Sequence, residues 1–321
     1  MRELRAAVVG AGKLGALHAD KYAKLSGVKL GFVVDIDRER AAQMAARYGA
    51  TAASDHRELA GRIDLATVAT PSSTHFAVAA DLLAAGVDVL LEKPMAATAE
   101  QARALAALVH KGGALLQVGY LERFNPAVRR LKTLLTGPRF IECHRLAPFT
   151  DRGTDVDVVL DLMSHDLDLI LSLTDSEVAS VEALGVAVLT DLVDVANARV
   201  RFADGMVANV NASRVAARRE RKIRFFQHDA YISTDYEARS IQVYRKTVAP
   251  SGGVATISAE RIELDAGDPL GDEVASFVAC VRSRAVPMVS AADGLRVIEL
   301  CELINDSITA ALGGGNRQGP R

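Results

Sequence analysis

The feature that most constrains the fold lies near the start of the chain, where a short apolar run leads directly into a glycine-rich turn. The segment VVGAGKLGALHA contains the spacing G-x-G-x-x-G between a predicted strand and a predicted helix. Such glycines permit a tight turn and a close approach of the backbone to a pyrophosphate, and the helix N-terminus attracts the phosphate charge. The predicted phosphate-binding residues are Gly10, Gly12, Lys13, Leu14 and Gly15.

The rest of the first third repeats this alternation of strand and helix. Short runs rich in Val, Leu and Ile, such as 28–35, 65–70 and 87–92, are separated by Ala-rich segments with helical spacing. Several of these segments end at Gly, a common helix stop. Alternation of this kind is typical of parallel strands joined by crossover helices. We expect a doubly wound α/β domain, a Rossmann fold, over residues 1–121.

An acidic residue ends the second predicted strand at the spacing that a dinucleotide site requires. Asp35 lies about 20 residues beyond Gly15, where a carboxylate binds the ribose hydroxyls of NAD and repels the 2′-phosphate of NADP. We therefore expect NAD as the cofactor. Arg38 is the competing signal because it could pair with a 2′-phosphate, although an exposed salt bridge explains it more simply. A Rossmann fold that has lost its cofactor is the structural alternative.

Polar residues also follow two further predicted strands, in ATPSSTHF (69–76) and LEKPMA (91–96). Ligands of open α/β sheets collect outside the carboxyl ends of the strands, so both segments should line one crevice with the glycine turn. A charged pair there can face a cofactor and a substrate, and Pro94 would stiffen the turn. A solvated strand end is the alternative. The candidate cofactor residues are Thr70, Pro71, His75, Glu92 and Lys93.

The character of the sequence changes after residue 121. Two helical segments are followed by alternating apolar and polar runs, and Asp204-Gly205 is a strong hairpin signal between two of them. Two further helical segments then lead to the tail GGGNRQGPR. We expect an α+β domain with an antiparallel sheet over residues 122–312 and a flexible tail over 313–321.

One helical segment of this second domain carries two titratable groups on an apolar background. Asp161 and His165 lie four residues apart, so they share one face of a helix otherwise rich in Leu and Val. Burial without function would leave costly polar atoms to satisfy, so the pair indicates a site. An Asp/His pair can also bind metal, but no further ligand pattern accompanies it, and we expect no metal.

Together these segments resemble the Gfo/Idh/MocA oxidoreductases, a family named for glucose-fructose oxidoreductase and inositol dehydrogenase. The matching segments occur in the family's order and are GAGKLG, ATPSSTH, EKP, GYLERFNP and DLMSHDLD. The resemblance covers nearly the whole chain. It implies a Rossmann domain followed by an α/β domain whose open, mostly antiparallel sheet forms the interface of a homodimer or homotetramer. It also implies that Lys93, Asp161 and His165 are the catalytic group.

The chemistry implied by this resemblance is oxidation of a secondary alcohol with hydride transfer to NAD. His165 would accept the hydroxyl proton because imidazole titrates near neutrality. Lys93 would hydrogen-bond the same oxygen and stabilise developing alkoxide charge, while Asp161 would orient the substrate or His165.

The segment 144–171 looks most like the nucleotide-sugar branch of the family. That branch oxidises UDP-N-acetylglucosamine to a 3-keto sugar for an aminotransferase in lipid A modification. Forked arginine donors would suit the diphosphate, although surface or interdomain arginines are the alternative. Met163 replaces a residue that is small in the family, and GTDVDVVL replaces a Gly-rich approach, which indicates a different pocket shape. The candidate substrate residues are Tyr120, Arg123, Asn125, Arg145, Arg152, Asp161 and His165.

Composition argues against several classes of partner. The formal charge of −2 provides no overall field to attract nucleic acid or an acidic membrane. Three cysteines lack the spacing of a disulfide framework or zinc cluster, and every long apolar stretch is interrupted by charged residues or Gly. The predicted first strand leaves no room for a signal peptide. We expect a cytoplasmic protein without nucleic-acid or membrane partners.

Three other functions fit parts of the sequence. The nearest is a dehydrogenase for a free sugar or inositol, which would be indifferent to a UDP group. A non-catalytic NAD-binding regulator would have no need for Lys93, Asp161 and His165 together. A reductase of imine or tetrapyrrole substrates is the third, because the fold alone does not determine the chemistry.

Overall fold

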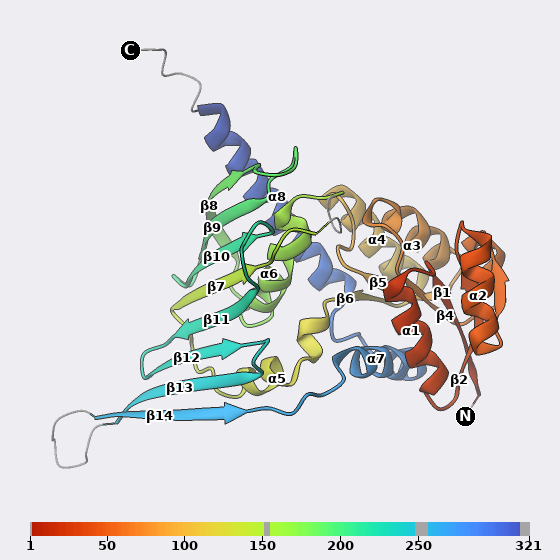
Figure 1. The fold of residues 1–321 in the computed structure, drawn as a ribbon, viewed down its shortest axis with the longest axis horizontal. Coiled ribbons are helices and arrows are strands. Elements are labelled where there is room, and N and C mark those ends of the chain that lie inside the picture. The colour runs from red at the N-terminus through yellow and green to blue at the C-terminus, as the bar shows by residue number, and fades with distance from the viewer. Residues whose placement is uncertain (1, 151–154, 248–255, 315–321) are drawn as a thin grey trace. The chain divides into compact units, whose positions relative to one another are not determined.

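The computed structural model describes residues 2–150, 155–247 and 256–314 (Figure 1). Among these residues, no helix combines the length and the apolar character needed to cross a membrane.

The chain divides into two compact units, and the first of them is discontinuous. The N-terminal unit comprises Met1–Phe124 and Asp268–Glu299, and the C-terminal unit comprises Asn125–Gly267 and Leu300–Arg321. The sequence pattern predicts a single boundary after residue 121. It does not reveal the return of 268–299, because an amphipathic helix has the same local pattern whichever unit it packs on.

The N-terminal unit contains the predicted parallel sheet. Its six strands lie in the order β3-β2-β1-β4-β5-β6, and every neighbouring pair is parallel. The sequence pattern does not predict β3, because its three residues are too short a run to show alternation. The strands are β1 (Leu4–Val9), β2 (Val28–Val34), β3 (Thr51–Ala53), β4 (Leu65–Val68), β5 (Asp88–Glu92) and β6 (Leu116–Gly119).

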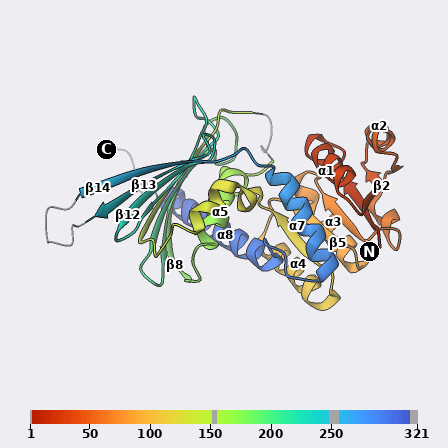
Figure 2. The ribbon, with the colours of Figure 1, turned by 90° about the horizontal axis from the view of Figure 1, so that it is seen from below.

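Helices cover both faces of this sheet (Figures 1 and 2). From β1 the chain moves one way to β2 and β3, and the other way to β4, β5 and β6. Because such crossovers are right-handed, the helices of the two halves lie on opposite faces. These helices are α1 (Lys13–Lys24), α2 (Arg38–Tyr48), α3 (His75–Ala84), α4 (Ala99–Gly112) and α7 (Pro269–Ser283). Helix α1 packs against α2 and α7, and α3 packs against α4.

Local signals set the helix ends of this unit. Helix α2 begins after Asp37, whose side chain accepts a hydrogen bond from the backbone N–H of Arg40 at 3.1 Å. It ends at Gly49, where φ is 66°. The switch from β1 to β4 in the strand order lies beside the glycine turn, and α/β sheets bind ligands at such switch points.

The C-terminal unit is built on an eight-stranded sheet in the order β14-β13-β12-β11-β7-β10-β9-β8. Among the described strands of this sheet, only β7 and β10 pair in parallel, so the sheet is mostly antiparallel, and its linear order leaves it open. The strands are β7 (Phe140–Leu146), β8 (Val178–Val186), β9 (Val195–Phe202), β10 (Val207–Ser213), β11 (Glu220–Phe226), β12 (Ala230–Asp235), β13 (Ser240–Thr247) and β14 (Thr256–Glu263).

The predicted hairpin is confirmed between β9 and β10. Gly205 has φ 85°, and Phe202 and Met206 are joined by a backbone hydrogen bond across the turn. Helices pack on one face of the sheet, and residues of the other face are half-exposed, as the alternating burial of β7 shows (Figure 2). The helices of this unit are α5 (Pro126–Lys132), α6 (Ser164–Leu171) and the later part of α8 (Ala291–Gly314). Helix α8 includes residues 313 and 314, which were predicted to belong to the flexible tail, and residues 315–321 lie outside the described residues.

Candidate functional site

The glycine turn joins β1 to α1 with little room for side chains at two of its three glycines. Gly10 has φ 100°, and a Cβ atom there would lie 2.5 Å from the carbonyl oxygen of Ala69. A Cβ on Gly15 would lie 1.8 Å from the carbonyl oxygen of Gly10. A Cβ on Gly12 would meet nothing within 4 Å, so this glycine faces open space at the N-terminus of α1. The turn thus has the shape that a phosphate group requires.

Asp35 ends β2 beside this turn, as the dinucleotide pattern predicts. Its carboxylate accepts hydrogen bonds from the backbone N–H groups of Ala11, at 2.7 Å, and Asp37, at 2.9 Å. Arg38 and Arg40 are both exposed, and the guanidinium of Arg40 lies 3.0 Å from Asp37 and 3.7 Å from the carboxylate of Asp35. Arg40 was not predicted, because spacing alone does not say which arginine of the first helical turn lies nearer the acid.

His75 connects the turns that follow β4 and β5. Its side chain is buried, with Nδ1 2.7 Å from the carbonyl oxygen of Pro94 and Nε2 3.0 Å from that of Thr70. Since carbonyl oxygens only accept, whichever ring nitrogen carries a proton donates it to the backbone. His75 therefore positions the two turns, while Lys93 is half-buried directly after β5, and its peptide bond to Pro94 is cis.

Glu92 is turned into the core of the N-terminal unit, which differs from the expectation that it faces the crevice with Lys93. It is 8% exposed, and its Oε1 lies 2.8 Å from Nε2 of the fully buried His18. A Cβ on Gly119 would come within 2.9 Å of its other oxygen. With Glu273 these residues form the His18–Glu92–Glu273 cluster, whose potential metal-ligand atoms lie within 4.8 Å of one another.

Asp161 and His165 lie on a continuous helical segment of the C-terminal unit. It begins with a π-helical turn, Val159–Met163, and continues as α6. Both side chains are half-buried, while Met163 is fully buried. The sequence predicts the helix but not the π-helical turn, a feature that is frequent at functional sites.

The predicted substrate arginines differ in their surroundings. Arg145 is 2% exposed and forms a bidentate ion pair with Asp166, in which both N–O distances are 2.9 Å. A buried ion pair inside the C-terminal unit is not the surface or interdomain position that the sequence left open as the alternative. Arg123 is also buried and lies 3.7 Å from Asp293. Arg152 lies outside the described residues.

Tyr120 and Asn125 are the other two predicted substrate residues outside the helix of Asp161 and His165. Tyr120 is fully buried after β6. Asn125 caps α5, because its side-chain oxygen accepts a hydrogen bond from the backbone N–H of Ala127 at 2.9 Å.

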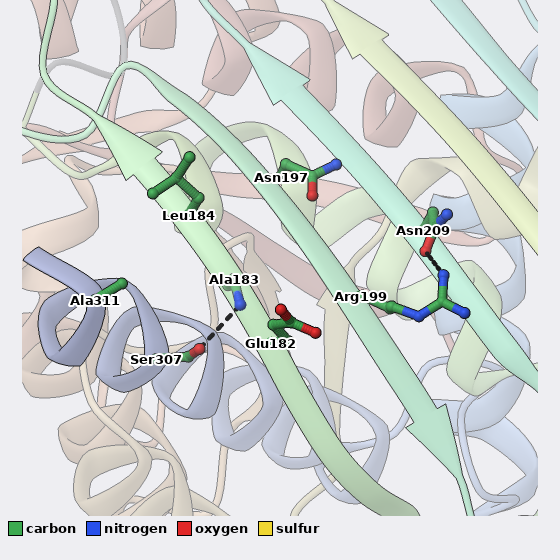
Figure 3. A pocket seen from close by; sticks show the side chains of 8 residues that line it. All are labelled: Glu182, Ala183, Leu184, Asn197, Arg199, Asn209, Ser307 and Ala311. Carbon is green, nitrogen blue, oxygen red and sulfur yellow. Dashed lines mark hydrogen bonds between the residues drawn. The ribbon is translucent and has the colours of Figure 1, made fainter.

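A pocket of about 480 Å³ lies in the C-terminal unit between β8, β9, β10 and α8 (Figure 3). Arg199 donates to Asn209 at 3.0 Å in this pocket, and the backbone N–H of Ala183 donates to Ser307 at 2.9 Å. The described residues that line it include no member of the predicted site. The pocket is therefore a feature of the sheet edge, where β8 is the last strand.

Comparison with known families identifies both parts of the chain. The model described as "Oxidoreductase family, NAD-binding Rossmann fold" matches residues 4–120. The model described as "GFO/IDH/MocA C-terminal domain" matches residues 128–233.

Individual relatives extend these matches. The chain is 36% identical over 313 residues to UDP-N-acetylglucosamine 3-dehydrogenase of Acidithiobacillus ferrooxidans, a match that covers 97% of this chain and 99% of the relative. A solved structure of that enzyme matches with a TM-score of 0.89 over the same shares. Inositol 2-dehydrogenase of Mycolicibacterium smegmatis is 33% identical over 57% of this chain and 56% of its own. These matches show that the chain belongs to the Gfo/Idh/MocA family of NAD-binding oxidoreductases.

Proposed function

We propose that this protein oxidises UDP-N-acetylglucosamine to its 3-keto form, with NAD as the hydride acceptor. The observation that carries the proposal is the extent of similarity: the match to the UDP-N-acetylglucosamine enzyme covers 97% of the chain, and the match to the inositol enzyme covers 57%. A match over 97% of the chain includes most of the C-terminal unit, and it bears on substrate choice because that unit carries Asp161 and His165. An aminotransferase that consumes the 3-keto sugar, as in lipid A modification, is the proposed pathway partner.

The N-terminal unit has the residues to hold NAD. The backbone N–H groups of the glycine turn and the N-terminus of α1 would bind the pyrophosphate, and Asp35 would bind the ribose hydroxyls. The buried carboxylate of Asp35 disfavours a 2′-phosphate, so NAD is preferred over NADP. Bound NAD supplies the electrophilic nicotinamide carbon that takes a hydride.

Three side chains are proposed to act on the reacting hydroxyl group. His165 accepts the hydroxyl proton, since imidazole changes charge near neutral pH. Lys93 donates a hydrogen bond to the oxygen and stabilises its developing negative charge. Asp161 orients the substrate or His165. Tyr120, Arg123, Asn125 and Arg152 stay as proposed substrate contacts, whereas the Asp166 ion pair occupies Arg145.

The direct test is NADH formation from UDP-N-acetylglucosamine, free N-acetylglucosamine and myo-inositol, each with purified protein, NAD and hydroxylamine to trap the ketone. The trap is needed because oxidation of an alcohol by NAD is often uphill at neutral pH. We expect NADH only with the UDP-sugar. Equal rates with a free sugar or inositol would assign the protein to that branch instead, and no NADH with any of the three would overturn the proposed substrate.

Two glycines of the turn should respond differently to substitution. Gly12→Val should fold, because φ is −75° and a Cβ there meets nothing within 4 Å, but its side chain would occupy the phosphate position and weaken NAD binding about tenfold or more. Gly15→Ala should instead destabilise the protein by about 1–3 kcal/mol, because its Cβ overlaps the Gly10 carbonyl. Thermal unfolding and calorimetric NAD titration of both variants check this. Equal stability losses in the two would contradict it.

We also propose that the open sheet face of the C-terminal unit joins copies of this chain. Four aromatic residues form a row across β7, β11, β12 and β13, with ring centroids 5.4, 5.0 and 5.6 Å apart in succession. They stand in register on adjacent strands and are half-exposed or exposed, and aromatic side chains are enriched in protein interfaces. The row consists of Phe140, Phe226, Tyr231 and Tyr244.

A charge placed in this aromatic row should separate the copies. The double substitution Phe226→Asp and Tyr231→Asp buries two carboxylates in the proposed interface, so we expect sedimentation velocity to show monomers where the wild type shows dimers or tetramers. Gln43→Asp, on the exposed face of α2, is the control and should keep the wild-type mass. A monomeric wild type, or an unchanged mass in the double variant, would refute this interface.

A further inference from the structure

A band of polar side chains crosses the apolar core of the N-terminal unit, between the sheet and helices α1 and α7. We call it the buried polar band. Its members come from five elements, and each is at most 8% exposed. They are His18 and Tyr22 of α1, Thr67 of β4, Glu92 of β5, Gln117 of β6 and Glu273 of α7.

Most side chains of this band are hydrogen-bonded, but the carboxyl group of Glu273 has no such bond among the described residues. Tyr22 and Thr67 share a hydrogen bond of 2.9 Å, and the amide of Gln117 donates to the backbone carbonyl of Glu273. Neither carboxyl oxygen of Glu273 has a hydrogen-bond partner among the described residues, and the same holds for Nδ1 of His18. Because one oxygen of Glu273 lies within 4.8 Å of the His18–Glu92 pair, this carboxyl group faces a second carboxylate inside the core.

Two ionised carboxylates in this place would be costly. Each would lose its hydration, and each would repel the other at short range. A single imidazole supplies at most one charge to offset them, and its Nε2 is already 2.8 Å from Glu92. Burial raises the pKa of Glu273 well above its ordinary value, and the neighbouring Glu92 raises it further. A protonated Glu273 would instead contribute a hydroxyl donor to a cluster that is rich in acceptors.

We propose that Glu273 is a neutral carboxylic acid in the folded protein and that it positions Glu92, and through it Lys93, for the reaction. Glu92 directly precedes Lys93, and the close backbone of Gly119 leaves its carboxylate little freedom. An ionised Glu273 would push Glu92 away from His18 and disturb the end of β5. The Lys93 part of this inference rests on the proposed function, whereas the charge state of Glu273 does not.

Other titratable groups near α7 are already engaged. Tyr22 is bonded to Thr67, and burial raises its pKa, so it stays neutral. Arg123, on the 3₁₀ helix Leu121–Phe124 that packs against α7, pairs with Asp293. Lys21 of α1 pairs with Asp268 just before α7, at an exposed position. Glu92 and His18 are the titratable groups of the cluster that lie beside Glu273, and burial of its carboxyl group acts together with Glu92 to favour the protonated form.

The first test compares the stability of the wild type with that of Glu273→Gln from about pH 5 to about pH 9, without substrate. Above the ordinary glutamate pKa of about 4.3 the unfolded chain releases this proton, while the folded chain keeps it until the raised pKa is passed. The wild type should therefore lose stability as pH rises, and its unfolding constant should increase relative to the variant by up to about tenfold per pH unit. If the stabilities of the wild type and the variant changed in parallel with pH, the proposal that Glu273 is neutral would be overturned.

The second test separates positioning from packing. Glu273→Gln keeps a neutral donor, whereas Glu273→Leu is neutral and has none. We expect the Gln variant to retain most of the wild-type kcat with UDP-N-acetylglucosamine, and the Leu variant to lose about tenfold in kcat at an unchanged NAD affinity. Equal kcat values in the two variants would overturn the positioning role. If Lys93 itself proves dispensable, the proposed function fails while the stability test still stands.

Two controls test whether the cluster binds a metal ion and provide a second measurement in case Glu273→Gln does not fold. A thermal midpoint that rises with Mn²⁺ or Zn²⁺ in the wild type but not in Glu273→Gln would show a cation in the cluster and overturn the neutral acid. If Glu273→Gln does not fold, the infrared carbonyl band of a protonated carboxylic acid in the wild type at neutral pH gives the same information. Its presence supports the proposal, and its absence overturns it.

Discussion

Lys93→Met is expected to reduce the kcat for UDP-N-acetylglucosamine oxidation by about 10²–10⁴-fold while NAD still binds. Methionine keeps the length and apolar stem of lysine but removes the ammonium group, and with it the donor proposed to stabilise the developing alkoxide. Lys93 is half-buried directly after β5, at the carboxyl ends of the parallel strands, where the glycine turn also lies. The loss should appear in kcat more than in KM, because the charge that Lys93 stabilises develops in the transition state.

The matched control for this experiment is Lys111→Met, which removes an exposed lysine near the end of α4. It should behave as wild type in turnover, NAD affinity and thermal unfolding. NADH formation with the ketone trap and calorimetric NAD titration measure both variants. Turnover within about threefold of wild type in Lys93→Met would remove Lys93 from the mechanism. Loss of NAD binding together with turnover would make it a cofactor contact instead.

The N-terminal unit was predictable from sequence because its strands and helices have different hydrophobic periods and are separated by Gly stops. Strands β7 and β14 of the C-terminal unit were missed for a physical reason. Polar residues such as Glu142 and His144 occupy the open face of β7 and break its apolar run, while β14 is almost entirely exposed. An edge strand of that kind depends on the backbone pairing of its neighbour, which local sequence does not show.

The residues of the candidate site were likewise predictable only in part. Residues whose roles follow from short spacings, such as the glycine turn with Asp35, lie together as expected. The His18–Glu92–Glu273 cluster was missed because it joins residues from α1, β5 and α7, far apart in the sequence. One local signal was present: Glu273 lies four residues before Phe277, on the stripe of α7 that is otherwise apolar and buried. An acid on the buried stripe of a helix requires a partner or a proton.

Arg145→Met is expected to destabilise the protein by about 3–5 kcal/mol. The guanidinium of Arg145 and the carboxylate of Asp166 are 3% and 2% exposed, and two hydrogen bonds of 2.9 Å join them. Removal of the arginine leaves the carboxylate of Asp166 buried beside β7, where water does not reach it. Since Asp166 directly follows His165, the loss should also disturb the first turn of α6. Denaturant unfolding gives the change in free energy.

A double replacement distinguishes a structural ion pair from a substrate contact. Arg145→Met with Asp166→Leu removes both charges, so most of the lost stability should return, because an apolar pair of similar volume is often no worse than a buried ion pair. Arg199→Met, which removes a half-exposed arginine bonded to Asn209, is the control and should change stability by less than about 0.5 kcal/mol. If Arg145→Met kept its stability but raised the KM for the UDP-sugar, Arg145 would return to the substrate site. Its burial against Asp166 favours the structural role. The guanidinium is bonded to both carboxylate oxygens of Asp166, and it would have to break that pair before it could bind a phosphate.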